Sequence, residues 1–162
     1  ISMYKMHGFT LGSTSIVIQS HIIGMFLPSL ITGTLIKKYG HSLIIYSGAF
    51  IYLICIFLSF YDQTFINYLM ALVLLGIGWN FLFIGGTSLL VLCYKESEKF
   101  KVQGFNDVLV FSIQSIASLT AGYSILKFSW NEINLACIPL VLLIILVSIR
   151  ADIYKKKLAF KS

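Results

Sequence analysis

The sequence predicts an all-α membrane protein with five transmembrane helices, and three observations support this fold class. Only 12 basic and 6 acidic residues occur among 162, whereas 58% of the residues are hydrophobic. Soluble domains contain about 25% charged residues, and the 11% found here cannot cover a surface that faces water. The charged residues are also clustered, and the segments between the clusters are largely apolar. A water-soluble domain is therefore excluded.

Five stretches without Asp, Glu, Lys or Arg divide the chain into membrane-crossing segments. Each contains between 17 and 32 residues, and a helix needs about 20 apolar residues to cross about 30 Å of hydrocarbon. Residues 71–75 and 140–147 are apolar without interruption, which favours helices over the alternating strands of a membrane barrel. We expect the helices at residues 14–36, 42–60, 66–93, 106–127 and 132–149.

The segments outside these helices predict the orientation of the chain. Residues 1–13 read as an extracytoplasmic loop or the remnant of a preceding helix, without the features of a signal peptide. Ten of the 12 basic residues lie on one side, in the first turn, in the loop after the third helix and in residues 150–162. The positive-inside rule makes that side cytoplasmic, so residues 150–162 form a basic cytoplasmic tail. Five crossings then place residue 1 outside, which suits a fragment whose upstream helix is missing.

The first helix contains three residues that a lipid-facing helix does not need. A polar side chain within a membrane is a functional candidate, because its burial in lipid is costly. Gln19 and His21 point about 200° apart on a regular helix, so they cannot both line one cavity. His21 either joins a neighbouring helix as a neutral imidazole or contacts a solute or a proton. Pro28 removes a backbone hydrogen bond and predicts a kink, either for gating or for packing alone.

The third helix carries Trp79 and Asn80 near its centre, among glycines. In one interpretation Trp79 stacks on a flat aromatic solute and Asn80 hydrogen-bonds it. In the other, Asn80 joins two helices and the glycines permit close helix packing. The glycines are Gly76, Gly78, Gly85 and Gly86.

The fourth helix is expected to begin with Asn106 and Asp107. An acidic residue at a helix start caps free amides and interacts favourably with the helix dipole. The alternative, proton coupling through Asp107, requires burial at the membrane midplane, and the neighbouring Lys101 argues against it. Gln114 lies further along the same helix and is a candidate to line a cavity.

Several classes of site find no support in the sequence. Cys55, Cys93 and Cys137 fall within or at the ends of the expected helices, where cysteine usually behaves as a small hydrophobe. Their spacing does not resemble a metal site, and no phosphate-binding loop, nucleophile elbow or zinc-binding helix motif occurs. We expect no cofactor, no metal and no enzymatic activity. The basic residues form no single face or stripe, so we expect no nucleic-acid partner.

A turn between the first two helices carries the most informative short motif. Residues 33–41 read Gly-Thr-Leu-Ile-Lys-Lys-Tyr-Gly-His. Gly33, with Ser29 one turn earlier, is expected to let another helix approach, and Gly40 is expected to permit an immediate reversal. The segment resembles the loop motif Gly-x-Leu-x-Asp-Arg-x-Gly-Arg of the major facilitator superfamily. Leu35, Lys38 and both glycines fit that motif. Lys37 occupies its acidic position and His41 its final basic position, and this departure resembles the degenerate copy between helices eight and nine.

Three longer segments extend this resemblance over essentially the whole chain. Residues 17–29 are similar to the eighth helix of a bacterial subgroup of that superfamily, and residues 78–87 are similar to the tenth. Residues 102–107 resemble the start of the eleventh helix. On this resemblance the chain corresponds to the C-terminal half of a transporter without helix seven. Some members of the subgroup are associated with riboflavin uptake.

The resemblance implies secondary transport of a small organic solute across the bacterial plasma (inner) membrane by alternating access. Within the lipid bilayer the chain would need a missing N-terminal half or a partner chain to complete its cavity. The competing hypothesis is a membrane-embedded assembly or interaction module that transports nothing. The expected cavity residues are Gln19, His21, Trp79, Asn80 and Gln114, and the expected cytoplasmic latch is formed by Gly33, Lys37, Lys38 and Gly40.

Overall fold

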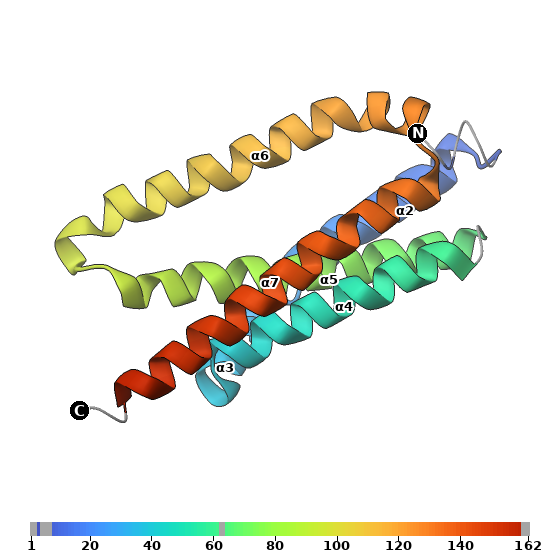
Figure 1. The fold of residues 1–162 in the computed structure, drawn as a ribbon. Helices are drawn as coiled ribbons and strands as arrows, with labels where there is room; N and C mark the ends of the chain where they lie inside the picture. The colour runs from blue at the N-terminus through green and yellow to red at the C-terminus, as the bar shows by residue number, and fades with distance from the viewer. Residues whose placement is uncertain (1–2, 4–7, 62–63, 160–162) are drawn as a thin grey trace.

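The computed structural model describes residue 3 and residues 8–61 and 64–159, and these residues form an all-helical protein without strands (Figure 1). Five helical segments in the described part are long and apolar enough to cross a membrane, which confirms the predicted fold class. The helices are α2 (Leu11–Phe26), α3 (Ser29–Tyr39), α4 (His41–Tyr61), α5 (Phe65–Leu90), α6 (Lys99–Lys127) and α7 (Trp130–Ala159), with short 3₁₀ turns η1 (Val91–Cys93) and η2 (Glu96–Glu98) between α5 and α6.

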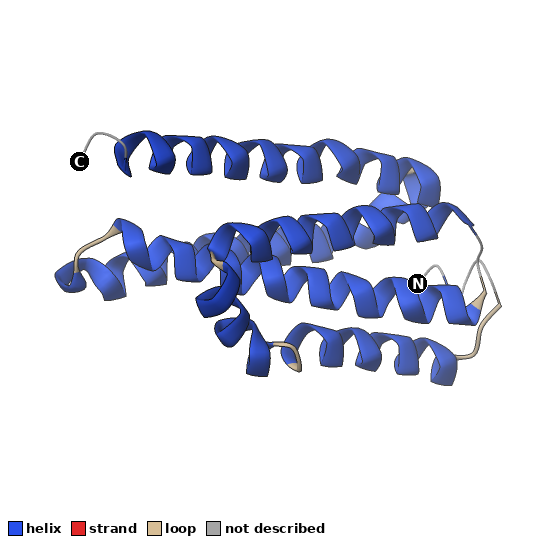
Figure 2. Cartoon of the chain, turned by 90° about the horizontal axis from the view of Figure 1, so that it is seen from below, coloured by secondary structure: helices blue, strands red, loops and turns tan. Residues whose placement is uncertain are grey.

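The first membrane span consists of two helices, α2 and α3. The Thr10 hydroxyl accepts a hydrogen bond from the backbone N–H of Ser13 and caps the start of α2. Helix α2 ends at Phe26, just before Pro28, which has no N–H to continue the backbone ladder. Helix α3 then bends away from the axis of α2 (Figure 2). The single span expected over residues 14–36 is found as Leu11–Tyr39, and the kink expected at Pro28 is a break that divides this span into two helices.

The chain reverses direction at a single residue after α3. Gly40 has a φ angle of 86°, and its N–H donates to the carbonyl oxygen of Ile36 at 2.8 Å. Residues with a side chain rarely adopt a positive φ, and this glycine allows α4 to begin at the next residue. Lys37 and Lys38 are exposed in the last turn of α3, where positive charge interacts favourably with the helix dipole.

Helix α5 packs closely against α2 on one side and α4 on the other. Against α2 the two backbones nearly touch, since a Cβ added at Gly76 would lie 2.5 Å from the carbonyl oxygen of His21. Against α4, a Cβ at Gly48 would lie 2.9 Å from the carbonyl oxygen of Gly78. Apart from the adjoining backbone of its own helix, no described atom lies within 4 Å of a Cβ at Gly33 or Gly86. The expected close approach at Gly33 is therefore not found among the described residues.

The last two helices extend beyond the expected membrane segments. Helix α6 begins at Lys99 instead of residue 106, and α7 continues to Ala159 instead of ending at residue 149. Lysine, arginine and glutamate are good helix formers, so a helix continues through charged residues after it leaves the lipid. The proposed tail 150–162 is thus helical as far as residue 159, and residues 160–162 lie outside the described part. So do residues 1–2 and 4–7 of the expected N-terminal segment.

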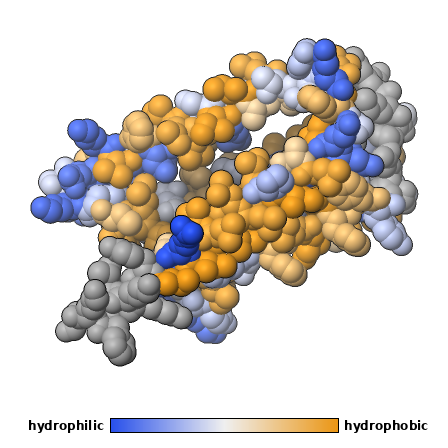
Figure 3. Space-filling view, in the orientation of Figure 1, coloured by the Kyte–Doolittle hydropathy of each residue, from blue (hydrophilic) through white to orange (hydrophobic). Residues whose placement is uncertain are grey.

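Helix α7 packs against α4, whereas α6 stands apart. Val141 of α7 forms a buried cluster with Ala49 and Ile56 of α4. No residue of α6 is buried, and the space-filling view shows an opening between α6 and the rest of the molecule (Figure 3). The outer surface is apolar, with Phe57 of α4 69% exposed and Leu119 of α6 84% exposed. A surface of this kind is stable in the hydrocarbon of a lipid bilayer.

Candidate functional site

The break at Pro28 is bridged by Asn80 of α5. The Asn80 side chain is 1% exposed, and its Nδ2 donates to the carbonyl oxygen of Met25 at 2.7 Å. On the other side of the break, the hydroxyl of Thr32 donates to Oδ1 of Asn80 at 2.7 Å. Helix ends leave carbonyl groups without intrahelical partners, and the Asn80 amide supplies one such partner at the end of α2. A single side chain therefore joins α5 to both α2 and α3.

Three further contacts complete this bridge. The Thr32 hydroxyl, which is fully buried, also lies 2.8 Å from the carbonyl oxygen of Pro28. The Ser29 hydroxyl donates to the carbonyl oxygen of Phe26 at 2.6 Å. The N–H of Leu27 donates to the carbonyl oxygen of Ile23 at 2.8 Å. The break is therefore an ordered joint, and in this conformation a solute cannot reach the buried amide of Asn80.

His21 forms a second polar connection between α2 and α5. Its Nδ1 lies 2.8 Å from the carbonyl oxygen of Leu72. A carbonyl oxygen can only accept a hydrogen bond, so Nδ1 carries the proton and Nε2 remains for another partner. This geometry is the helix-joining alternative considered for His21, and the ring is half-buried.

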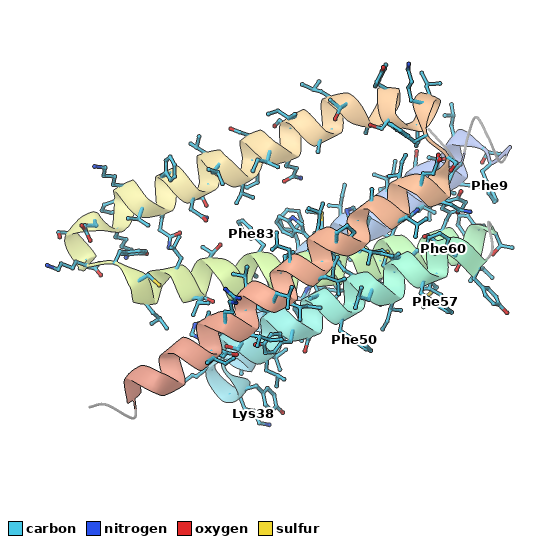
Figure 4. All side chains as sticks on the ribbon, viewed as in Figure 1. Phe9, Lys38, Phe50, Phe57, Phe60 and Phe83 are labelled. Atoms are coloured by element: carbon cyan, nitrogen blue, oxygen red, sulfur yellow. The ribbon has the colours of Figure 1, made fainter. Side chains whose placement is uncertain are left out.

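An aromatic group lies on the face of α5 that is turned toward α6. The Trp79 and Phe83 rings are stacked, with centroids 4.7 Å apart and planes 10° apart. Phe111 of α6 approaches Phe83 at 6.1 Å between ring centroids. Figure 4 shows Phe83 pointing from α5 into the space between these two helices. We call these three rings the aromatic wall. The stacked faces of Trp79 and Phe83 are turned toward each other, so a flat aromatic molecule can stack only on an outer face of the group.

The two expected glutamines do not join this group. Gln19 is exposed on α2 and Gln114 is exposed on α6. Neither makes a hydrogen bond to Asn80 or His21 among the contacts of the described residues. Gln114 lies one turn from Phe111 along α6, so its side chain is near the aromatic wall and accessible to a solute.

The expectation that Asn106 and Asp107 cap the start of the fourth helix does not hold. Both lie about two turns after Lys99, the first residue of α6. The first free amides of the helix are therefore out of reach. Asp107 Oδ1 instead accepts a hydrogen bond from Nδ2 of Asn106 at 3.2 Å, and Asp107 lines a shallow hollow with Phe111 and Ser115. The helix begins earlier than the charge pattern predicts because it continues through the basic residues Lys99 and Lys101.

Sequence reasoning missed Thr32, Phe83 and Phe111 as members of the site. Phe83 follows Trp79 by four residues and so shares its helix face, which the sequence does reveal. Thr32 and Phe111 belong to other helices, and only the packing of α3 and α6 places them beside α5. In the described part of the chain, no three His, Cys, Asp or Glu residues are placed to hold a metal ion. The groups that do converge are the three aromatic rings of Trp79, Phe83 and Phe111, which can bind a flat organic molecule by stacking.

Comparison with known proteins identifies the family of the chain. The sequence profile of the Major Facilitator Superfamily matches residues 1–161. The riboflavin transporter RfnT of Brucella anthropi is 34% identical over 139 residues, which cover 86% of this chain and 35% of that protein. The uncharacterized MFS-type transporter YdeG of Bacillus subtilis is 35% identical over 133 residues, covering 81% of this chain and 31% of YdeG.

A third relative, the uncharacterized MFS-type transporter YddS of Bacillus subtilis, is 34% identical over 145 residues, covering 84% of this chain and 33% of YddS. The chain thus spans about a third of the length of the curated relatives it matches. No solved structure matches it significantly. Its profile match covers nearly all residues and its helices are long enough to cross a membrane, so the chain is a multi-pass membrane protein of the Major Facilitator Superfamily.

Proposed function

We propose that this chain forms part of a secondary transporter that moves a small organic solute across the plasma membrane, without enzymatic chemistry. The observation that carries the proposal is the aromatic wall of Trp79, Phe83 and Phe111, which spans α5 and α6, with Phe83 pointing into the space between them (Figure 4). The similarity to named transporters supports the same conclusion. The wall lies beside an ordered helix break, so a solute that stacks on it is close to a joint that can move.

The chemistry of the wall favours a flat aromatic solute with polar edges. Stacking a planar ring on aromatic side chains contributes about 1–3 kcal/mol per ring. Gln114 is exposed near Phe111 and supplies an amide for the polar edge of such a ring. The relative from Brucella anthropi is named a riboflavin transporter, and a flavin has this shape. We therefore propose a flavin or a similar heteroaromatic compound as the solute class.

The proposed mechanism is alternating access, in which two halves of a transporter rock about a central site. Rotation of α3 about the Pro28 joint would move the turn that carries Lys37, Lys38 and Gly40. Asn80 would transmit this movement to α5, because it is bonded on both sides of the joint. We propose that this turn and the end of α7 face the cytoplasm, in agreement with the distribution of basic residues.

The exposed helix α6 supports the proposal that this chain functions together with further helices. None of its residues is buried, although it carries Gln114 and the ring of Phe111. In a membrane, polar residues are stable when they face a partner helix or an aqueous cavity. An N-terminal half or a partner chain would fill the opening between α5 and α6 and complete the cavity.

Uptake of radiolabelled riboflavin into proteoliposomes tests the proposed function. The protein is expressed with the whole reading frame that contains this chain, and Trp79→Ala is compared with Trp79→Phe. Loss of a stacking ring is expected to weaken solute affinity about 5- to 150-fold, corresponding to about 1–3 kcal/mol, whereas phenylalanine retains most of it. Phe57→Ala removes an exposed ring from the outer face of α4 and is expected to have no effect (Figure 4).

Two results would contradict the proposal. Uptake that is equally sensitive to Phe57→Ala and Trp79→Ala would place the solute elsewhere. Absence of uptake of riboflavin and of other heteroaromatic solutes, with correctly folded protein, would favour a membrane module without transport activity.

A further inference from the structure

One carboxylate ties the start of α4 to the extended end of α7. Ser42 Oγ donates to Oδ1 of Asp152 at 2.5 Å, and the Tyr46 hydroxyl donates to Oδ2 at 2.7 Å. Both donors lie in the first two turns of α4, and Asp152 lies on the part of α7 that continues beyond the expected membrane segment. The contact joins residues separated by 110 and 106 positions in sequence. Asp152 thus connects two distant parts of the chain at one end of the bundle.

The local structure of α4 explains why a carboxylate is suited to this position. Helix α4 begins directly after Gly40, which has no side chain to cap it. The start of a helix carries free amide groups and the positive end of the dipole. Asp152 brings negative charge beside this end, and hydrogen bonds to a charged acceptor are stronger than those between neutral groups. The ionised carboxylate therefore stabilises both the start of α4 and its contact with α7.

Helix α7 is joined to α4 at two levels, whereas α3 is set apart from its chain neighbours by breaks at both of its ends. Helices α4 and α7 also meet further along, in the buried cluster of Ala49, Ile56 and Val141. Helix α3, in contrast, is separated from α2 by the Pro28 break and from α4 by the turn at Gly40. Its buried polar connection to α5 is the Thr32–Asn80 bond. A rotation of α3 needs a fixed point at the far side of the Gly40 turn, and that point is the start of α4.

We propose that Asp152 is a positioning residue for transport, which holds the start of α4 against α7 so that α3 can turn against a fixed frame. This inference rests on the proposed function. Asp152 belongs to α7, whereas the aromatic wall belongs to α5 and α6, so the carboxylate acts on the conformational step and not on solute binding. Its removal lowers the maximal transport rate and leaves KM unchanged.

The first test measures transport kinetics of the whole transporter with radiolabelled riboflavin. Asp152→Asn is expected to lower the maximal rate about tenfold, equivalent to about 1.4 kcal/mol, at unchanged KM. The exchanged variant Ser42→Asp/Asp152→Ser places the carboxylate on α4 and the hydroxyl on α7, and it is expected to recover most of the rate. Tyr46→Phe removes one donor and keeps the ring, so an intermediate rate is expected. If Asp152→Asn does not fold, Tyr46→Phe is the variant that tests the contact.

The second test does not depend on transport. Trypsin cleaves after the exposed Lys37 and Lys38 in the turn beside α4, and the rate is followed by mass spectrometry on detergent-purified protein. Asp152→Asn is expected to accelerate this cleavage several-fold, and the increase should equal or exceed the increase caused by Tyr46→Phe. Cleavage at Lys99 is expected to stay unchanged. The exchanged variant is expected to slow cleavage at Lys37 and Lys38 again.

The two tests distinguish failure of this inference from failure of the proposed function. Unchanged cleavage in Asp152→Asn, or an exchanged variant no better than the single one, would overturn the role of Asp152. A rise in KM with an unchanged maximal rate would do the same. Altered cleavage in a protein that takes up no solute would support the role of Asp152 in holding α4 against α7 and would contradict the proposed transport function.

Discussion

Gly76→Ala is expected to destabilise the packing of α2 against α5 by about 1–3 kcal/mol, the usual cost of overpacking. The added Cβ would lie 2.5 Å from the carbonyl oxygen of His21 and 2.9 Å from the backbone nitrogen of Met25. These are backbone atoms, so no rotation of a side chain relieves the contact. The two helices must move apart, and the hydrogen bonds of His21 and Asn80 across this interface are strained. Thermal unfolding of the detergent-purified protein measures the loss.

Gly86→Ala is the matched control for this substitution. It changes the same residue type in the same helix, and apart from the adjoining backbone of that helix no described atom lies within 4 Å of the new Cβ. Alanine favours a helix over glycine by up to about 1 kcal/mol, so this variant should be as stable as the wild type or more stable. Equal destabilisation by both variants would show that the close approach at Gly76 does not determine stability.

Asn80→Ala is expected to have the second large effect, because it removes both bonds of the bridge across the Pro28 break. Interhelical hydrogen bonds in membrane proteins contribute about 0.6–1.7 kcal/mol each, and the Met25 carbonyl and the Thr32 hydroxyl both lose a buried partner. We expect lower thermal stability together with slower transport. If Asn80 positions α3 and does not touch the solute, the maximal rate falls while KM stays unchanged.

A double-mutant cycle with Thr32→Val identifies the contact responsible. The valine removes the hydroxyl that donates to Asn80, so much of the effect of Thr32→Val should disappear in the Asn80→Ala background. Gln114→Ala, on the exposed side of α6, should be additive with Asn80→Ala. Additive effects of Thr32→Val and Asn80→Ala would contradict the bridge, and a rise in KM for Asn80→Ala would restore the solute-binding interpretation.

The membrane fold was predictable because it depends on composition and on charge spacing. Lipid excludes ionised side chains, so the charge-free stretches mark the crossings without any knowledge of packing. The start of α6 and the end of α7 were not predictable in the same way. Charge marks the edge of the membrane and not the end of a helix, so residues 99–105 and 150–159 are helical although they lie outside the apolar segments.

The candidate site was predictable only in part, because its partners lie on different helices. Asn80 stands out as a polar residue in an apolar segment, but the sequence does not reveal that its partners are Thr32 and the Met25 carbonyl. Proline alone also does not decide where a helix ends. Pro139 lies inside the continuous helix α7, whereas Pro28 separates α2 from α3. The latter break is supported by contacts from α5, and contacts of that kind are properties of the folded chain.

The separation of α2 from α3 also has a consequence for local unfolding. Backbone hydrogen bonding along the first span is interrupted at Pro28, so fraying of α3 does not propagate into α2. We therefore expect this span to behave as two cooperative units of unequal size, in contrast to a helix without proline such as α5. Amide protons of the shorter unit should exchange with solvent at their own opening free energy, and Asn80, which is bonded to both units, couples the opening of one to the opening of the other.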